Sequence, residues 1–116
     1  MKIVISPAKS LDLERTVPTK TYSQPFFLEE AEKLNAVLSK KNPRTLARLM
    51  GISESLANIN WQRNQDFQLP MTSENARQAV YTFNGDVYLG LDPFTLSKDQ
   101  IDQMQERLRI LSGLYG

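Results

Sequence analysis

The N-terminal stretch Met1-Lys2-Ile3-Val4-Ile5-Ser6-Pro7 decides how the fold is organised. Its three central residues are apolar and β-branched, and Pro7 ends the run because proline cannot continue a strand ladder. The apolar run is continuous rather than alternating, so we predict a buried strand over residues 2–6. One early strand, several short helices and few further strands predict an α/β fold, with α+β as the alternative.

The residues after this strand carry loop signals and then helix signals. Residues 7–23 combine two prolines with several Thr and Ser residues, which predicts a long loop. Apolar residues then recur at helical spacing, which predicts a helix from about residue 25 to residue 41.

Cap residues divide the next stretch into two short helices. Asn42 and Pro43 are typical of the N-cap and first position of a helix, which we expect to run to about residue 50. Gly51 is predicted to end it in a left-handed conformation. Ser53 is expected to cap a second helix over residues 54–65.

The remaining residues carry weaker signals. Thr72 or Ser73 is expected to begin a helix through about residue 79, and residues 80–83 could form a strand before a turn at Asn84-Gly85. Residues 87–91 carry no decisive pattern. A capping box at Ser97 and Gln100 predicts a further helix. The last residues, 110–116, look like a strand that enters a turn, and we expect the chain to be the incomplete N-terminal part of a larger domain.

The composition excludes several kinds of chemistry within these residues. The 116 residues include no Cys and no His, so there can be no disulfide, thiolate nucleophile, zinc finger or Ser-His-Asp triad. We expect no metal site and no cofactor here, so the sequence leans against an enzyme. No stretch approaches the roughly 20 apolar residues of a transmembrane helix, so no membrane partner is expected.

The stretch from Leu46 to Ile59 resembles the helix-hairpin-helix motif of DNA repair proteins. In that motif a glycine turn presents backbone amides at the start of the second helix, where they can hold a phosphate. Two features depart from it: the second glycine is replaced by Ser53, and the lysine often found just after the hairpin is absent, since Glu54 and Ser55 stand there. The alternative interpretation is an ordinary helical turn with a buried face.

The charge distribution favours the DNA interpretation. Residues 40–65 contain five basic residues and one acidic residue, a net charge of +4, whereas the whole chain has a net charge of +1. Basic side chains near the hairpin would attract DNA irrespective of its sequence. The candidate DNA-binding residues are Lys40, Lys41, Arg44, Arg48, Gly51, Ile52 and Ser53.

A second candidate site lies in the polar loops. The segment Ser6-Pro7-Ala8-Lys9-Ser10-Leu11-Asp12 follows the first strand, where sites are often found, and Lys9 with the two Ser hydroxyls could hold an anion. The turn from Gly85 to Leu91 could contribute as well. The candidate pocket residues are Ser6, Lys9, Ser10, Asp86 and Tyr115.

Four segments together resemble one family. Ile5-Ser6-Pro7-Ala8-Lys9-Ser10-Leu11-Asp12, Asn75-Ala76-Arg77-Gln78-Ala79, Gly85-Asp86-Val87-Tyr88-x-Gly90-Leu91 and Leu111-Ser112-Gly113-Leu114-Tyr115-Gly116 occur in this order in the YaaA peroxide stress resistance family. The chain is similar to the N-terminal part of a YaaA-like domain over residues 1–116, with a helix-hairpin-helix-like segment at 43–65.

The resemblance implies a cytoplasmic protein that limits peroxide damage, is linked to lowered free iron, and binds DNA. Residues 46–59 would then be the DNA-binding element. The alternative is an enzyme for a small phosphorylated or nucleotide-like substrate, using loops 6–12 and 85–91. The enzyme alternative predicts that these loops line one pocket away from residues 46–59, and the DNA interpretation predicts that both loops flank the hairpin on one basic face. A third option, a structural module that needs the missing C-terminal half of its own chain, predicts an exposed apolar patch.

Overall fold

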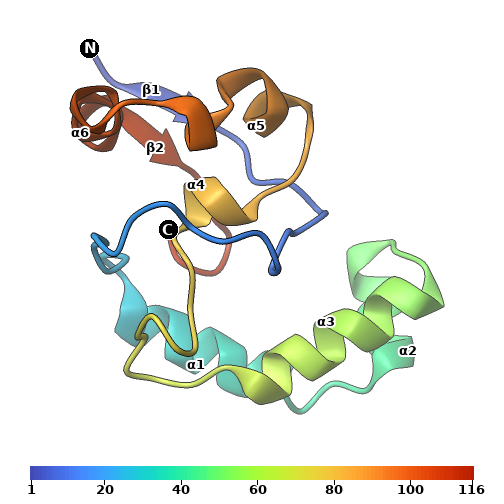
Figure 1. The fold of residues 1–116 in the computed structure, drawn as a ribbon. Coiled ribbons are helices and arrows are strands. Elements are labelled where there is room, and N and C mark those ends of the chain that lie inside the picture. Colours follow the sequence, from blue (N-terminus) through green and yellow to red (C-terminus); the bar gives the residue numbers. More distant parts are fainter. The chain divides into compact units, whose positions relative to one another are not determined.

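The computed structural model describes all 116 residues, and the chain divides into two compact units (Figure 1). The first unit comprises residues 1–24, 71–114 and Gly116. The second comprises residues 25–70 and Tyr115. Helices and a two-stranded parallel sheet make the chain an α/β protein, as predicted.

The second unit contains three helices. They are α1 (Leu28–Leu38), α2 (Pro43–Met50) and α3 (Glu54–Asp66). α1 is shorter at both ends than the predicted helix over residues 25–41. Ala31, Leu46 and Ala57 are fully buried in this unit. The side-chain amide of Asn35 also lies inside and donates to the Asn64 carbonyl at 3.1 Å, which links α1 to α3.

The predicted caps of α2 and α3 are confirmed. Asn42 Oδ1 accepts from Thr45 N at 2.8 Å, and Pro43 is the first residue of α2. Gly51 ends α2 with φ of 62°, in the left-handed region. Ser53 Oγ accepts from Leu56 N at 3.3 Å at the start of α3.

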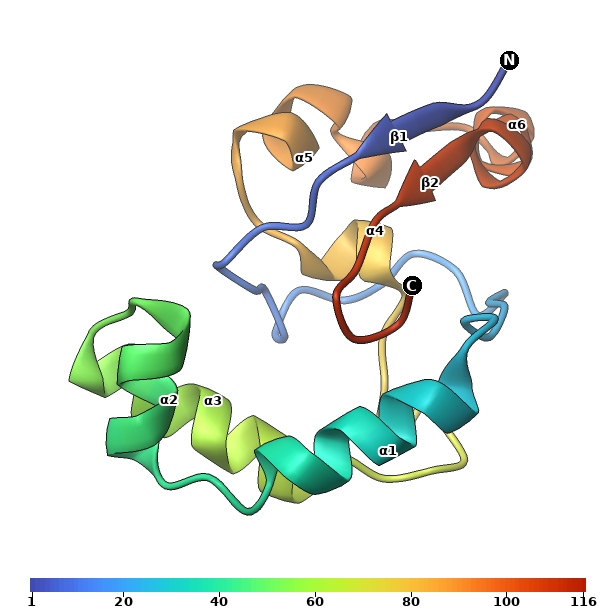
Figure 2. The ribbon, with the colours of Figure 1, turned by 180° about the vertical axis from the view of Figure 1, so that it is seen from behind.

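The strands lie in the first unit. β1 (Ile3–Ile5) pairs in parallel with β2 (Leu108–Ile110), and Figures 1 and 2 both show the two strands side by side. The expectation that the first strand is buried is wrong, because Ile3 is 44% exposed and Val4 is 55% exposed. The physical reason is that the sheet has only two strands, so it has neither neighbouring strands nor full layers to cover it.

The rest of the first unit consists of short helices. They are α4 (Ala79–Thr82), α5 (Asp86–Leu91), the 3-10 helix η1 (Pro93–Thr95) and α6 (Lys98–Arg107). The capping box predicted for α6 is confirmed: Ser97 N donates to Gln100 Oε1 at 2.8 Å, and Gln100 N donates to Ser97 Oγ at 3.3 Å. No helix of the chain combines the length and apolar character needed to cross a membrane.

Two predictions for residues 72–83 are wrong. The expected helix over 72–79 is a turn, in which Asn75 Oδ1 accepts from Thr72 N and Thr72 Oγ1 accepts from Glu74 N. These local side-chain bonds compete with a helix. Residues 80–82 of the expected strand over 80–83 belong instead to α4, because burial of Tyr81 overrides the local β propensity. Phe83 alone is extended and forms an isolated antiparallel bridge with Leu11.

The turn expected at Asn84-Gly85 leads into a helix, α5, over residues for which the sequence predicted no structure. Gly85 is the N-cap of α5, which includes residues 87–91. Near the C-terminus, the strand expected from residue 110 begins earlier, as β2, and is followed by a turn at residues 113–115.

Candidate functional site

The turn between α2 and α3 is a compact hairpin closed by backbone hydrogen bonds. The amides of Gly51 and Ile52 both donate to the Ala47 carbonyl, the latter at 3.2 Å, which is the pattern that ends a helix with a left-handed residue. The first intrahelical bond of α3 runs from Ala57 N to Ser53 O at 2.9 Å. Of the amides between them, that of Leu56 donates to Ser53 Oγ, and those of Ser53, Glu54 and Ser55 have no partner in the chain, at a helix end where an anion is stabilised.

The side chains that hold the hairpin together are apolar. Leu46 on α2 and Ala57 on α3 are both fully buried, and Ile52 in the turn is half-buried. Trp61 is half-buried as well, in keeping with a packing role. This packing fixes the turn and so fixes the direction in which its amides point.

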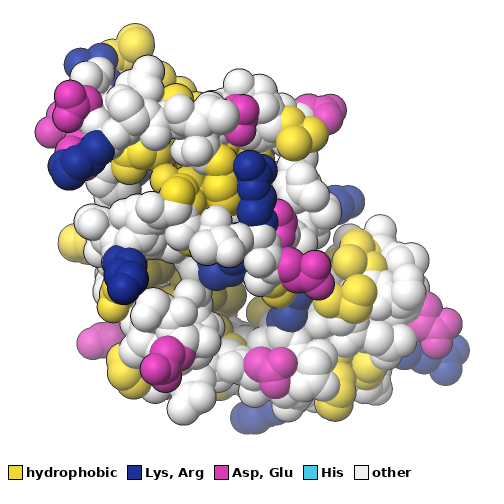
Figure 3. All heavy atoms as spheres, viewed as in Figure 1, with side chains coloured by type: hydrophobic (Ala, Val, Ile, Leu, Met, Phe, Trp, Pro, Cys, Tyr) yellow, Lys and Arg dark blue, Asp and Glu magenta, His cyan; other side chains and the backbone are white.

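The basic residues before and on α2 are open to solvent. Lys40, Arg44 and Arg48 are exposed and Lys41 is half-exposed. Arg44 and Arg48 are four residues apart and share one face of α2, opposite the buried Leu46. The single ion pair of the chain joins two residues of α6, so none of these cations is neutralised by a carboxylate. Figure 3 shows basic side chains bordering α2.

The two departures from the hairpin motif have visible consequences. Ser53 uses its side chain to cap α3, so its hydroxyl occupies the helix end that glycine would leave open. Glu54 is exposed at the first position of α3 and places a negative charge there. Its carboxylate competes with an incoming phosphate for the positive end of the helix.

The loops of the second candidate site meet in the first unit. Tyr88 Oη donates to the Ser6 carbonyl at 2.6 Å, and Asn84 N donates to the Ser10 carbonyl at 3.0 Å. A Cβ added to Gly85 would lie 3.2 Å from the Ala8 Cβ, so glycine allows the loops to approach closely here.

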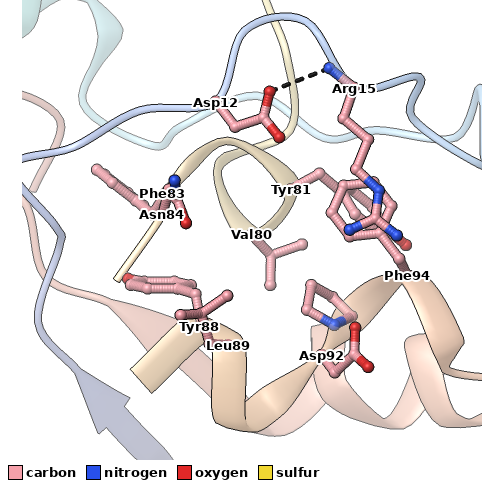
Figure 4. A pocket seen from close by; sticks show the side chains of 11 residues that line it. Asp12, Arg15, Val80, Tyr81, Phe83, Asn84, Tyr88, Leu89, Asp92 and Phe94 are labelled. Atoms are coloured by element: carbon pink, nitrogen blue, oxygen red, sulfur yellow. Dashed lines mark hydrogen bonds between the residues drawn. The ribbon is translucent and has the colours of Figure 1, made fainter. Parts of the chain in front are cut away.

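A cavity of about 60 Å³ opens beside this junction (Figure 4). Aromatic side chains form much of its wall, and Tyr81 packs edge-on against Phe94 with ring centroids 5.1 Å apart. The Arg15 guanidinium lies 3.8 Å from the centre of the Phe94 ring, an arrangement that stabilises the cation. The lining residues are Asp12, Arg15, Val80, Tyr81, Phe83, Asn84, Tyr88, Leu89, Asp92, Pro93 and Phe94.

Asp12 is held in place by backbone donors. Its Oδ1 accepts from the amides of Glu14 and Arg15, each at 3.0 Å. The hydrogen bond from the Arg15 amide, followed by that from Glu14, lowers the pKa of this carboxyl below its usual 3.8. Burial raises the pKa of Tyr81 and Tyr88 above 10.0. At neutral pH the cavity therefore combines an ionised carboxylate with protonated phenols.

The candidate residues fall into different places. The Ser6 carbonyl accepts from Tyr88 of α5, and the Ser10 carbonyl accepts from Asn84, just before α5. The side chains of Lys9 and Asp86 are exposed. None of these four residues lines the cavity. Tyr115 belongs to the second unit, where its ring stacks on Phe67 with centroids 6.5 Å apart.

Sequence reasoning missed the residues that do line the cavity. Asp12 lies in the segment 6–12 and Tyr88 in the segment 85–91, so the expected proximity of these two segments was the available signal. Arg15 and Phe94 had no sequence signal, since their contact joins positions 79 residues apart.

Comparison with known proteins places the chain in a family. The family model described as Peroxide stress protein YaaA matches residues 1–116. UPF0246 proteins of Flavobacterium johnsoniae and Flavobacterium psychrophilum are 56% and 52% identical over 116 residues, which is 100% of this chain and 46% of each relative. A UPF0246 protein of Alteromonas mediterranea is 51% identical over the same 116 residues, or 45% of its length. The chain thus spans about half the length of these relatives, and it belongs to the YaaA peroxide stress protein family.

Proposed function

We propose that this chain contributes a non-sequence-specific DNA-binding element to a cytoplasmic peroxide stress protein. In this proposal the helix-hairpin-helix-like segment 43–65 holds a backbone phosphate, and residues 1–116 form the N-terminal part of a YaaA-like domain. Covering the DNA backbone would limit the damage that iron and peroxide cause there. Within these residues no thiolate or imidazole is present to destroy peroxide directly, so protection or sensing of DNA suits them better.

The observation that carries the proposal is the α2–α3 hairpin itself. Its left-handed Gly51 turns the chain so that the amides at the start of α3 point outward, beside a helix whose Arg44 and Arg48 are exposed and unpaired. Backbone amides and unpaired guanidinium groups are the donors that bind phosphate without reading bases. Binding of this kind is sensitive to salt because each phosphate contact releases counterions.

The test is fluorescence anisotropy with a labelled duplex over a salt series. The double variant Arg44→Glu, Arg48→Glu is expected to bind more weakly, and the slope of log affinity against log salt should fall by about 2, one per lost phosphate contact. The matched control is Lys20→Glu, Arg107→Glu, which makes the same charge change at two exposed positions of the first unit.

An unchanged isotherm for the α2 double variant would contradict the hairpin assignment. An equal loss in the control would show that only the total charge of the chain matters.

A second candidate function is supported by the meeting of the two loops. Loops 6–12 and 85–91 touch, and the cavity beside them contains no residue of 46–59. Asp12, Tyr88 and Leu89 of these loops line the cavity, which favours an enzyme for a small phosphorylated or nucleotide-like substrate, whereas the predicted pocket residues Ser6, Lys9, Ser10 and Asp86 do not line it. Arg15 is the one cation in the lining. A cavity of about 60 Å³ would take one small group rather than a whole nucleotide, since ligand pockets usually exceed about 300 Å³.

Calorimetric titration with inorganic phosphate and with adenosine monophosphate tests the second candidate. Saturable binding that Arg15→Gln weakens, and that the exposed control Lys20→Gln leaves intact, would support it. The absence of binding, or binding that Arg15→Gln does not change, would eliminate this site.

A further inference from the structure

The β1–β2 sheet leaves apolar residues open on both of its faces. Side chains alternate along a strand, so Ile3 and Val4 lie on opposite faces, and they are 44% and 55% exposed. Leu111, directly after β2, is 59% exposed. Figure 3 shows apolar side chains at the surface of this unit. An exposed apolar patch is what the structural-module hypothesis expects of the chain.

The Val4 face is the more open of the two. In the parallel register Val4 lies beside Arg109, so no apolar residue of β2 shields it. The Arg109 guanidinium turns back to the carbonyls of Gln105 and Leu108, at 2.9 Å and 2.7 Å. The Arg109 guanidinium is held at the C-terminal end of α6. It therefore leaves the Val4 side chain exposed to solvent.

This two-stranded parallel sheet lacks the cover and the edge pairing that parallel sheets normally have. Parallel sheets are covered on both faces almost without exception, because their crossover connections place helices there. Two strands alone also leave an unpaired row of backbone groups at each outer edge. Burying Val4 and Ile3 would add stabilisation in proportion to the apolar area removed from water.

We infer that the β1–β2 sheet is a docking surface for polypeptide equivalent to the part of the longer relatives that this chain does not match. That part is about half of each relative, whereas the sheet-forming residues lie wholly in the matched region. It adds at least one strand to an outer edge of the sheet and covers the Val4 face. A segment of that length is enough for the further strands and helices that a parallel sheet requires.

Hydrogen exchange tests the docking surface. The 116-residue chain is compared with the same residues joined to the unmatched part of the Flavobacterium johnsoniae relative, in the order found in that relative. Amides of residues 3–5 and 108–110 are expected to exchange at least about tenfold more slowly in the longer chain. Amides of α3 should exchange at similar rates in both.

A pair of variants separates docking from general stability. Val4→Lys is expected to lower the melting temperature of the longer chain and to abolish the added protection, while leaving the 116-residue chain nearly unchanged. Leu49→Lys on α2 is the matched control, since Leu49 is 66% exposed in the second unit, and it should spare the added protection.

Equal exchange in the two chains, or a Val4→Lys variant that keeps full protection, would overturn the inference. So would sedimentation of the 116-residue chain as a dimer that Val4→Lys dissociates, because a second copy would then be the occupant. If the joined chain does not fold, the full-length Flavobacterium johnsoniae relative replaces it in the exchange comparison.

Discussion

At the residue scale, Gly51 is a position where backbone conformation limits the choice of side chain. Its φ of 62° lies in the left-handed region, where a Cβ is strained, although no atom lies within 4 Å of the place that a Cβ would occupy. Any cost of a larger residue is therefore conformational rather than steric. The turn that presents the amides of α3 depends on this single position.

Gly51→Ala is expected to destabilise the second unit by about 1 kcal/mol, the cost of a left-handed non-glycine residue. Chemical denaturation followed by the fluorescence of Trp61 measures this change. Gly90→Ala provides the control, since Gly90 is inside α5 with open space around it and no positive φ. That variant should be neutral or more stable by up to about 1 kcal/mol. Equal effects of the two substitutions would contradict the conformational explanation.

At the element scale, the start of α3 serves two purposes that conflict. Ser53 and Glu54 stabilise the helix end by capping and by compensating its positive pole. The same two side chains occupy the place where a phosphate would bind. Helix stability and anion binding therefore depend on the same backbone amides, and changes at this end should move them in opposite directions.

Glu54→Gln makes that opposition measurable. Loss of the carboxylate is expected to lower the stability of the second unit by about 0.3–1 kcal/mol, the usual contribution of an anion in the first turn. Affinity for duplex DNA should rise by roughly two- to fivefold, the same free energy expressed as binding. Thermal melting and anisotropy on one protein sample give both values. Weaker DNA binding by this variant would place the phosphate elsewhere.

At the scale of the whole molecule, the net charge and the average burial of apolar side chains conceal local differences. The net charge of +1 includes a segment of net +4 around the α2–α3 hairpin. Few apolar side chains are buried: Ala31, Leu46, Ala57, Tyr81, Tyr88 and Pro93. A chain of this length can usually hide about two-thirds of its unfolded surface, and the open sheet of the first unit is where apolar cover is most clearly lacking.

The sequence by itself determined the local structure of the second unit. Asn42, Gly51 and Ser53 act through hydrogen bonds and dihedral angles within a few residues of themselves, so their roles could be predicted from neighbours alone. The capping box of α6 and the family resemblance were predictable for the same reason, since both depend on short motifs.

Only the tertiary structure decided the remainder. Residues 80–82 are helical because Tyr81 is buried against Phe94, a contact that local propensity cannot express. Whether β1 is buried depends on how many strands join it, and the pairing of Ile3 with Leu108 spans almost the whole chain. The cavity likewise unites Asp12 with residues some 70 to 80 positions away. Such contacts form only when distant segments of the chain meet. Their contribution to the free energy of folding therefore cannot be predicted from any short stretch of sequence.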